Sequence, residues 1–466
     1  MIKDTNNADV SYYIQLYGIL KSEIIKKNAP NSKFYSIRQV GIKYNTNINT
    51  VLKVFKLLER DGYIFSEKGK GFFIKECSNF SIREEIIPIM ESFHFGQTNT
   101  EGINFSNGSP PNDYFPDKIY QQLIEKALKD YGSSLLGYQD VQGLESLRIL
   151  LADYLEKKDI FVSKNDIMIT SGTQQSLVVI LRTFSESTLK TVALASPTYP
   201  NALNLLKGMC NIKTFNLKND GWDLVEFEKV LKKERIHFVY VITNFQNPTG
   251  ICWSEEKKKK LLKLAHEYNF YIIEDDCFSE FYYTKKVDPL KTLDQTGNEK
   301  VIYIKTYSKL LMPGIGLAYM ILPPAIMQKA ILTKYSLDHS TSGLNQKVLE
   351  YFIADKYLDT HVKNLKKIFK AKHRKILELL ADVPHITILN KSKGGFFIWI
   401  QLADYIDEEK FYHKCKLRGV SILPGSIFYL DKRSSGKIRL SFITPTLEEL
   451  EEGVKIIKDI LIHCDF

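Results

Sequence analysis

Lys309 is the residue whose position most strongly indicates chemistry. It follows the apolar run at 301–304, stands directly after Ser308 and precedes a Pro-Gly pair at 313–314. A lysine amine at the end of a buried strand can attack an aldehyde cofactor and hold it as a Schiff base. Ser308 and Lys309 therefore predict a binding site for pyridoxal 5'-phosphate, with Lys309 as the catalytic residue.

Two further polar residues follow apolar runs and suit the ring of such a cofactor. Asn247 lies in an Asn-Pro-Thr-Gly turn after the run at 238–242, and its amide could donate to the phenolic oxygen. Asp275 follows the run at 271–273, and a carboxylate there could keep the pyridine nitrogen protonated. Each feature also has an ordinary explanation, because this tetrapeptide is a good turn sequence and acidic strand ends are frequent in α/β proteins.

A phosphate group is well held by backbone N–H groups at the start of a helix. The Ser-Gly-Thr-Gln segment between the apolar run at 167–169 and a helix expected from Leu177 offers such groups. This segment predicts a phosphate cradle, although the same turn is also a common helix cap. The residues of the cradle are Ser171, Gly172, Thr173 and Gln174.

Two other side chains could contact the cofactor or its ligand. Tyr199, in a Ser-Pro-Thr-Tyr-Pro segment, could stack on the ring or simply pack on the sheet. Arg439, on a late strand, could clamp a carboxylate with two hydrogen bonds or bridge a structural acid.

These candidates must be positioned by an α/β domain. From residue 103 onward, helical stretches alternate with short apolar runs at 192–195, 238–242, 271–273 and 301–304. Uninterrupted runs of this kind suit strands of a parallel sheet that helices cover on both faces. From about residue 345 the chain is first helical and then shows strand patterns, at 395–400 and 437–442. This predicts a smaller C-terminal α+β subdomain.

The first eighty residues form a separate basic region. They contain 13 Lys and Arg against 7 Asp and Glu, an excess of six in a chain whose net charge is +10. Apolar spacing predicts three helices and then two short strands around a tight turn, at 11–28, 37–44, 48–60, 63–65 and 72–74. This is the order of a winged helix, which we expect over residues 1–76, with a linker over 77–102.

The basic region resembles the GntR-type winged helix-turn-helix. The resemblance rests on the segments at 14–15, 36–38, 49–51, 57–62 and 69–71. A recognition helix enters the major groove with polar side chains at its first turn, while neighbouring cations meet phosphates. The resemblance implies DNA contacts from Ser36, Arg38, Lys43, Asn47, Asn49, Thr50, Lys53, Lys68 and Lys70.

Residues 103–466 resemble the class I aminotransferases of fold type I. The candidates occur in that family's order, with Tyr138 added in a Gly-Tyr-Gln-Asp segment. The resemblance implies that Asn247 bonds the phenolic oxygen, Asp275 pairs with the pyridinium and Lys309 forms the internal Schiff base. It also implies that Tyr138 reaches the phosphate of the neighbouring subunit of a homodimer, and that Arg439 holds an effector's carboxylate.

A GntR-type winged helix joined to an aminotransferase-like domain is similar to the MocR-type transcription regulators. The resemblance implies a homodimer that binds paired half-sites on double-stranded operator DNA and senses an amino compound or pyridoxal phosphate itself. An effector can change the DNA-bound arrangement of the dimer only if it binds one conformation of the protein more tightly than another. The alternatives are a working aminotransferase with a vestigial N-terminal module, and a regulator that has lost the cofactor and binds another ligand.

Two positions depart from the family pattern. The arginine that binds the phosphate is Gly316 here. This removes a charge-assisted contact worth about 1.5–3 kcal/mol, or roughly ten- to a hundredfold in affinity. A tyrosine that would bond the phenolic oxygen is replaced by Cys277, while Lys305 and Lys309 are candidates to supply the missing phosphate charge. These losses predict little or no transamination turnover but leave attachment of the cofactor possible.

Composition narrows the class and the compartment. The chain has 466 residues, of which 44% are hydrophobic and 25% charged, as in a soluble protein of two or three domains. No apolar stretch approaches the roughly 20 residues of a membrane span, and no secretory signal is evident. Six scattered cysteines without a Cys-x-x-Cys pair indicate neither a disulfide framework nor a metal site, which predicts a cytoplasmic protein.

Overall fold

The computed structural model describes most of the chain, namely residues 13–14, 16–21, 23–24, 29, 31–44, 46–67, 69–75, 102–184, 189–295 and 297–463. Two compact units are present, Met1–Glu91 and Ser92–Phe466. The linker predicted over 77–102 lies outside the described residues apart from Gly102.

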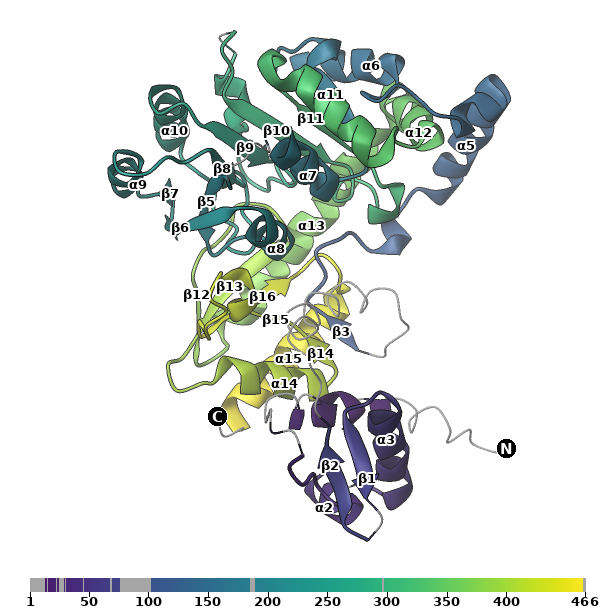
Figure 1. Cartoon of the computed structure of the whole chain (residues 1–466), viewed down its shortest axis with the longest axis vertical. Coiled ribbons are helices and arrows are strands. Elements are labelled where there is room, and N and C mark those ends of the chain that lie inside the picture. Colours follow the sequence, from purple (N-terminus) through teal and green to yellow (C-terminus); the bar gives the residue numbers. More distant parts are fainter. Residues whose placement is uncertain are drawn as a thin grey trace. The chain divides into compact units, whose positions relative to one another are not determined.

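The N-terminal unit contains helices followed by a hairpin, in the predicted order (Figure 1). The helices are α2 (Ile37–Lys43) and α3 (Ile48–Arg60), and the antiparallel hairpin is formed by β1 (Ile64–Glu67) and β2 (Gly71–Ile74). The described residues between 13 and 24 are also helical, which confirms that part of the helix predicted over 11–28.

Side-chain caps explain where α2 and α3 begin. The Ser36 hydroxyl accepts the Gln39 N–H while the Gln39 side chain accepts the Ser36 N–H, which is a reciprocal capping box. Asn47 caps α3 by accepting the Thr50 N–H at 2.7 Å. The apolar residues of α3 are buried in the core of this unit: Val51, Val54, Phe55 and Leu58.

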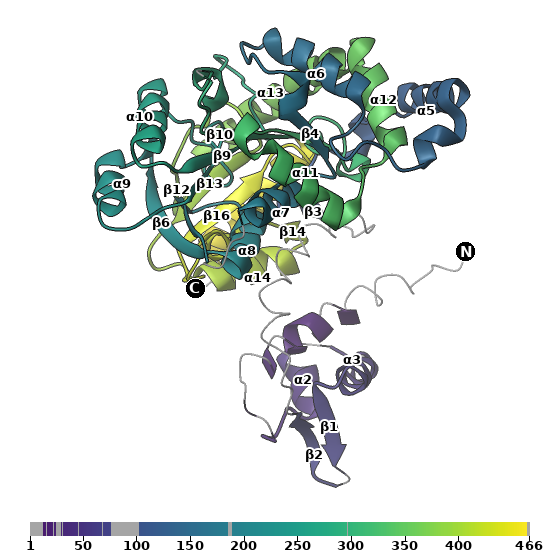
Figure 2. The ribbon, with the colours of Figure 1, turned by 45° about the horizontal axis from the view of Figure 1, so that its top comes forward.

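The C-terminal unit is built on an eight-stranded mixed sheet (Figures 1 and 2). The strand order is β4-β11-β10-β9-β8-β5-β6-β7, and the five strands from β10 to β6 run parallel. The predicted parallel sheet is therefore confirmed at its centre, while β11 and β7 add antiparallel pairings that were not predicted. The strands are β4 (Ile167–Thr170), β5 (Thr191–Ser196), β6 (Asn211–Lys218), β7 (Gly221–Trp222), β8 (Phe238–Val241), β9 (Tyr271–Asp275), β10 (Val301–Thr306) and β11 (Ala318–Ile321).

Helices cover both faces of this sheet, which explains the uninterrupted apolar runs. Ile272 and Val301 pack with α9 and α10, whereas their neighbours Ile273 and Ile302 pack with α7, α8 and α11 on the other face. The helices are α5 (Asp117–Tyr131), α6 (Glu145–Glu156), α7 (Thr173–Thr183), α8 (Pro200–Met209), α9 (Leu224–Leu231), α10 (Glu255–Glu267), α11 (Pro324–Asp338) and α12 (Gly343–Ala354). None of the described helices is both long and apolar enough to cross a membrane.

The smaller C-terminal subdomain has a four-stranded antiparallel sheet with helices. The strand order is β12-β13-β16-β15. A separate pair, β3 (Ile103–Asn104) with β14 (Val420–Ser421), ties the start of the unit to this subdomain. The remaining elements are α13 (Tyr357–Ala381), β12 (Ile386–Ile388), β13 (Phe397–Leu402), α14 (Glu408–Leu417), β15 (Leu423–Pro424), β16 (Lys437–Ser441) and α15 (Leu447–His463).

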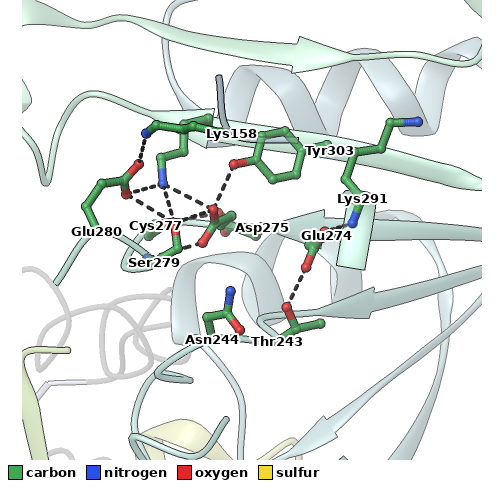
Figure 3. Close-up of polar contacts among 12 residues, drawn as sticks. Lys158, Thr243, Asn244, Glu274, Asp275, Cys277, Ser279, Glu280, Lys291 and Tyr303 are labelled. Atoms are coloured by element: carbon green, nitrogen blue, oxygen red, sulfur yellow. Dashed lines mark hydrogen bonds and ion pairs between the residues drawn. The ribbon is translucent and has the colours of Figure 1, made fainter. Parts of the chain in front are cut away.

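A buried charged cluster joins the carboxyl ends of β9 and β10 (Figure 3). Lys305 Nζ donates to Asp276 Oδ2 at 3.1 Å and also to the Glu280 carboxylate, which Lys158 contacts from the other side at 3.0 Å. The side chains of Lys305 and Asp276 are only 3% and 1% exposed. Burial lowers the pKa of Lys305, but the charges of Asp276 and Glu280 more than offset this, so the pKa is raised. Two cations thus balance two carboxylates.

Replacing Lys305 by methionine should destabilise the C-terminal unit by about 3–5 kcal/mol, because removing one member of a buried ion cluster leaves the others uncompensated. Urea unfolding followed by circular dichroism measures the effect. The matched control is Lys263→Met, which removes an exposed lysine that pairs with Glu267 at 3.6 Å; its cost should be about 0.5 kcal/mol or less. Equal costs for the two variants would contradict a structural role for the cluster.

Candidate cofactor site

Lys309 lies just beyond β10, in a largely desolvated position. Its Nζ donates to Ser109 Oγ at 3.1 Å. Burial lowers the pKa of Lys309 to about 8, with further influence from the nearby charges of Cys277, Arg439 and Asp275. A substantial neutral fraction of the amine near neutral pH is what a nucleophile requires.

Asp275, the last residue of β9, is a fully buried carboxylate. Tyr240 donates its hydroxyl to Oδ2 at 2.8 Å, and the Cys277 thiol donates to Oδ1 at 2.8 Å. Burial raises the pKa of Asp275, and these two hydrogen bonds oppose the rise. No ion pair to Asp275 is present among the described residues. A protonated pyridine nitrogen would offset the desolvation of this carboxylate.

Arg439, in β16, brings an unpaired positive charge into the same site. Its Nη1 donates to Asn247 Oδ1 at 3.0 Å, its Nη2 donates to the Ser106 carbonyl, and its guanidinium lies 4.1 Å from the centre of the Phe397 ring. Within the part of the chain that the structure describes, Nε is buried without a hydrogen-bond partner. Burial lowers the pKa of Arg439 to about 9. A buried guanidinium with an unsatisfied N–H and no carboxylate among the described residues suits an anionic ligand.

Asn247 and Tyr199 lie in the same neighbourhood. Asn247 is buried, and because its oxygen accepts from Arg439, its amide N–H groups point elsewhere and can serve as donors. Tyr199 immediately precedes α8. Burial raises the pKa of Tyr199, and the charges of Cys277, Asp275 and Arg439 also act on it. The structure therefore brings together the residues predicted for the ring end of the cofactor.

The predicted phosphate cradle lies where β4 passes into α7. Gly172 has a φ of +133°, and a Cβ added there would meet no atom within 4 Å. No side chain caps the N-terminus of α7, so its first N–H groups suit an anion. Ser171 is an exception, because its N–H already donates to Gln175 Oε1 at 2.8 Å. Of the four predicted cradle residues, Gly172, Thr173 and Gln174 thus remain candidates for backbone N–H contacts with a phosphate.

Gly316 lies beside this cradle and brings no charge to it. It has a left-handed backbone with a φ of +59°, and an added Cβ would lie 4.0 Å from the Ser171 carbonyl oxygen. The hypothesis that Lys305 supplies the missing charge is wrong. Successive side chains of β10 point to opposite faces of the sheet, so Lys305 lies on the same face as Tyr303. On that face both Lys305 and Tyr303 donate hydrogen bonds to Asp276. The neighbouring Ile304 packs on the α7 side.

The two remaining residues predicted for the cofactor site are Tyr138 and Ser308. Tyr138 is 86% exposed and contacts the edge of His339, with ring centres 5.6 Å apart. That it reaches the phosphate of a neighbouring subunit stays a prediction. Ser308 stands next to Lys309 and accepts a hydrogen bond from the Thr306 hydroxyl at 3.1 Å.

Sequence reasoning missed three contributors. Ser106 and Ser109 reach Arg439 and Lys309 from the start of the unit, because β3 pairs with β14. Neither serine carries a local signal, since the contacts span hundreds of residues. Tyr240 holds Asp275 from within an apolar strand, where a hydroxyl that needs a partner was the available signal.

The residues predicted to contact DNA are mostly exposed on the N-terminal unit. Ser36, Arg38, Asn47, Asn49 and Lys53 are exposed. Lys68 lies outside the described residues.

Three of these positions are less available for a DNA contact. Thr50 is only 6% exposed, which leaves little of its side chain for the predicted contact. Lys43 pairs with Glu23 at 2.6 Å, and Lys70 pairs with Glu67 at 3.0 Å. These pairs reduce the positive charge available for phosphates.

The donor set fits pyridoxal phosphate. A desolvated amine suits the aldehyde, a buried carboxylate suits the pyridine nitrogen, and uncapped helix N–H groups suit the phosphate. When bound, this cofactor supplies an electron sink at its ring. Asn247, Asp275 and the start of α7 would hold its two ends, and Lys309 would meet its aldehyde.

Comparisons with known proteins agree with this geometry. A family model described as aminotransferase class I and II matches residues 100–457. The aromatic-amino-acid aminotransferase 1 of Thermococcus litoralis is 31% identical over 402 residues, covering 84% of this chain and 92% of that protein. A Bacillus subtilis protein named uncharacterized HTH-type transcriptional regulator YdfD is 27% identical over 463 residues, covering 95% of this chain and 94% of its own.

A solved structure also matches over most of the chain. The kynurenine aminotransferase of Pyrococcus horikoshii, in complex with PMP, superimposes with a TM-score of 0.74 at 30% identity and covers 87% of this chain and 97% of its own. The family match spans far more than half of the sequence. This chain therefore belongs to the class I and II aminotransferases, the family whose cofactor is pyridoxal phosphate.

Proposed function

We propose that this chain is a DNA-binding transcription regulator of the MocR type, in which the aminotransferase-like unit senses an amino compound or pyridoxal phosphate. The proposal rests on the presence of a second compact unit, with helices and a hairpin, that precedes the cofactor-binding unit in the sequence. The family match begins at residue 100, so it does not include the first 99 residues. The relative named as an HTH-type regulator covers 95% of this chain, so its similarity must extend into those 99 residues.

The N-terminal unit serves, in this proposal, as a GntR-type winged helix. Asn49 and Lys53 are exposed on the first turns of α3, which would enter the major groove. Arg38, exposed on α2, would meet a phosphate. Two such units in a homodimer would bind paired half-sites.

Replacing Arg38 or Lys53 by alanine should weaken binding to DNA from upstream of the chain's own gene. Arg38→Ala should reduce the dependence of affinity on salt by about one ion, because it removes one phosphate contact, whereas Lys53→Ala should weaken binding most at the DNA sequence that α3 reads. Fluorescence anisotropy at several salt concentrations measures this. Lys263→Ala, on α10 of the other unit, is the control with the same charge change. Footprinting that finds no protected site upstream of its own or the adjacent gene would count heavily against the proposal.

The effector would carry both an amine and a carboxylate. The amine would react where Lys309 holds the cofactor, and the carboxylate would meet Arg439, whose buried Nε has no partner. Lys309 and Arg439 lie close enough for the charge of one to lower the pKa of the other. An α-amino acid has its two groups suitably close together.

Adding pyridoxal phosphate should produce an absorbance band at about 410–430 nm that Lys309→Ala lacks. The band should form faster as the pH rises through about 8, because only the neutral Lys309 amine attacks. Amino acids should then shift the band without repeated exchange with a 2-oxo acid. Lys263→Ala should behave as the unchanged protein.

A working aminotransferase is the alternative function. It is supported by the 31% identity to an aromatic-amino-acid aminotransferase and by the presence of Asn247, Asp275, Lys309 and Arg439 in one site. Rapid multiple-turnover exchange between an amino acid and a 2-oxo acid, in the assay above, would establish this alternative and displace the sensor proposal.

Restoring an arginine at Gly316 should tighten cofactor binding. Gly316→Ala is the matched control, because it imposes the same left-handed backbone strain without the charge. Relative to this control, Gly316→Arg should bind pyridoxal phosphate roughly ten- to a hundredfold more tightly. Spectroscopic titration gives both dissociation constants. Equal affinities would mean that Gly316 is not the position where phosphate charge was lost.

A further inference from the structure

A chain of three side chains runs from the phosphate cradle to a buried lysine on α11. Gln175, the third residue of α7, accepts the Ser171 N–H with Oε1 at 2.8 Å and donates from Nε2 to Asp338 Oδ2 at 2.6 Å. Asp338, the last residue of α11, accepts from Lys334 Nζ at 2.9 Å. The Lys334 side chain is 0% exposed, and that of Asp338 is 23% exposed.

The direction of these hydrogen bonds sets the orientation of the Gln175 amide. An ionised carboxylate only accepts hydrogen bonds, so Asp338 requires the NH₂ end of the amide to face it. The carbonyl end must then face Ser171, whose N–H it holds at the turn into α7. Without Asp338, the amide could rotate and release that turn.

The ion pair keeps this arrangement electrically neutral. Asp338 by itself would repel a phosphate in the cradle, but the buried ammonium of Lys334 balances its charge one helical turn away. Because Gly316 supplies no guanidinium, a bound phosphate would depend on backbone N–H groups that point in fixed directions. The exact position of the Ser171–Gly172 turn therefore affects phosphate binding more than it would in a site with an arginine.

We propose that Asp338 is a positioning residue for the cofactor's phosphate, acting through Gln175 on the Ser171–Gly172 turn, with Lys334 holding Asp338 in place. The inference deepens the proposed cofactor site and rests on it. It assigns to the end of α11 a task specific to the phosphate group, distinct from attachment of the aldehyde to Lys309.

Two double variants isolate this task. Lys334→Met with Asp338→Ala removes the ion pair and the acceptor for Gln175, whereas Lys334→Met with Asp338→Asn removes the same charges but retains an amide oxygen as acceptor. The full chain is titrated spectroscopically with pyridoxal phosphate and with pyridoxal, which has the aldehyde but no phosphate.

The alanine double variant should bind pyridoxal phosphate about three- to tenfold more weakly and bind pyridoxal with unchanged affinity. The asparagine double variant should stay within about twofold of the unchanged protein for both ligands. Gln175→Met, which leaves the ion pair intact, should reproduce the selective loss and provides the test if the buried pair proves necessary for folding.

Equal weakening for both ligands, or no difference between the alanine and asparagine variants, would reduce the ion pair to a structural contact and overturn the inference. In that case the unchanged protein would still bind pyridoxal phosphate, so the cofactor site itself would stand. Absence of pyridoxal phosphate binding by the unchanged protein would overturn both.

Discussion

The site depends on one geometric constraint, which is that successive residues of a strand face opposite sides of the sheet. Because of it, three adjacent carboxylates at the end of β9 have three different environments. Glu274 accepts two backbone N–H groups, those of Leu290 and Lys291. Asp275 faces the site on the other side, and Asp276, just beyond the strand, pairs with Lys305. Of these three neighbouring carboxylates, Glu274 and Asp276 thus stabilise the fold, and Asp275 is left to contact a ligand.

Buried charges are paired on one side of this sheet edge and unpaired on the other. The cluster of Lys305, Asp276, Glu280 and Lys158 is balanced and closed. On the opposite side, the carboxylate of Asp275 and the guanidinium of Arg439 are buried without ion pairs among the described residues. Burying an unpaired charge is costly, so a ligand that presents a pyridinium and a carboxylate would relieve both costs at once. Binding such a ligand would therefore also stabilise the fold.

The phosphate end follows a different principle. Neutral backbone dipoles at the start of α7 replace a guanidinium, and the Ser171 N–H is already engaged by Gln175. Such a site holds its anion less tightly than one with a cation. Half-occupancy of such a site then requires a higher cofactor concentration. This property suits the proposed sensor better than an enzyme that must remain loaded through many turnovers.

Patterns local in the sequence were sufficient for most of the architecture. Alternating apolar runs predicted the parallel centre of the sheet, and apolar spacing predicted helices at 37–44 and 48–60, where α2 and α3 lie. These signals are reliable because the burial of apolar side chains on one or both faces of an element is set by a few neighbouring residues.

Contacts between distant segments could not be read in the same way. Only the fold shows that Lys305 faces away from the cradle, that Thr50 is buried and that Ser109 contacts Lys309. Residue types and order along the chain determined which cofactor chemistry is possible here. The tertiary structure alone decided which charges are neutralised by the protein and which remain for a ligand, because that depends on strand faces and on pairings hundreds of residues apart.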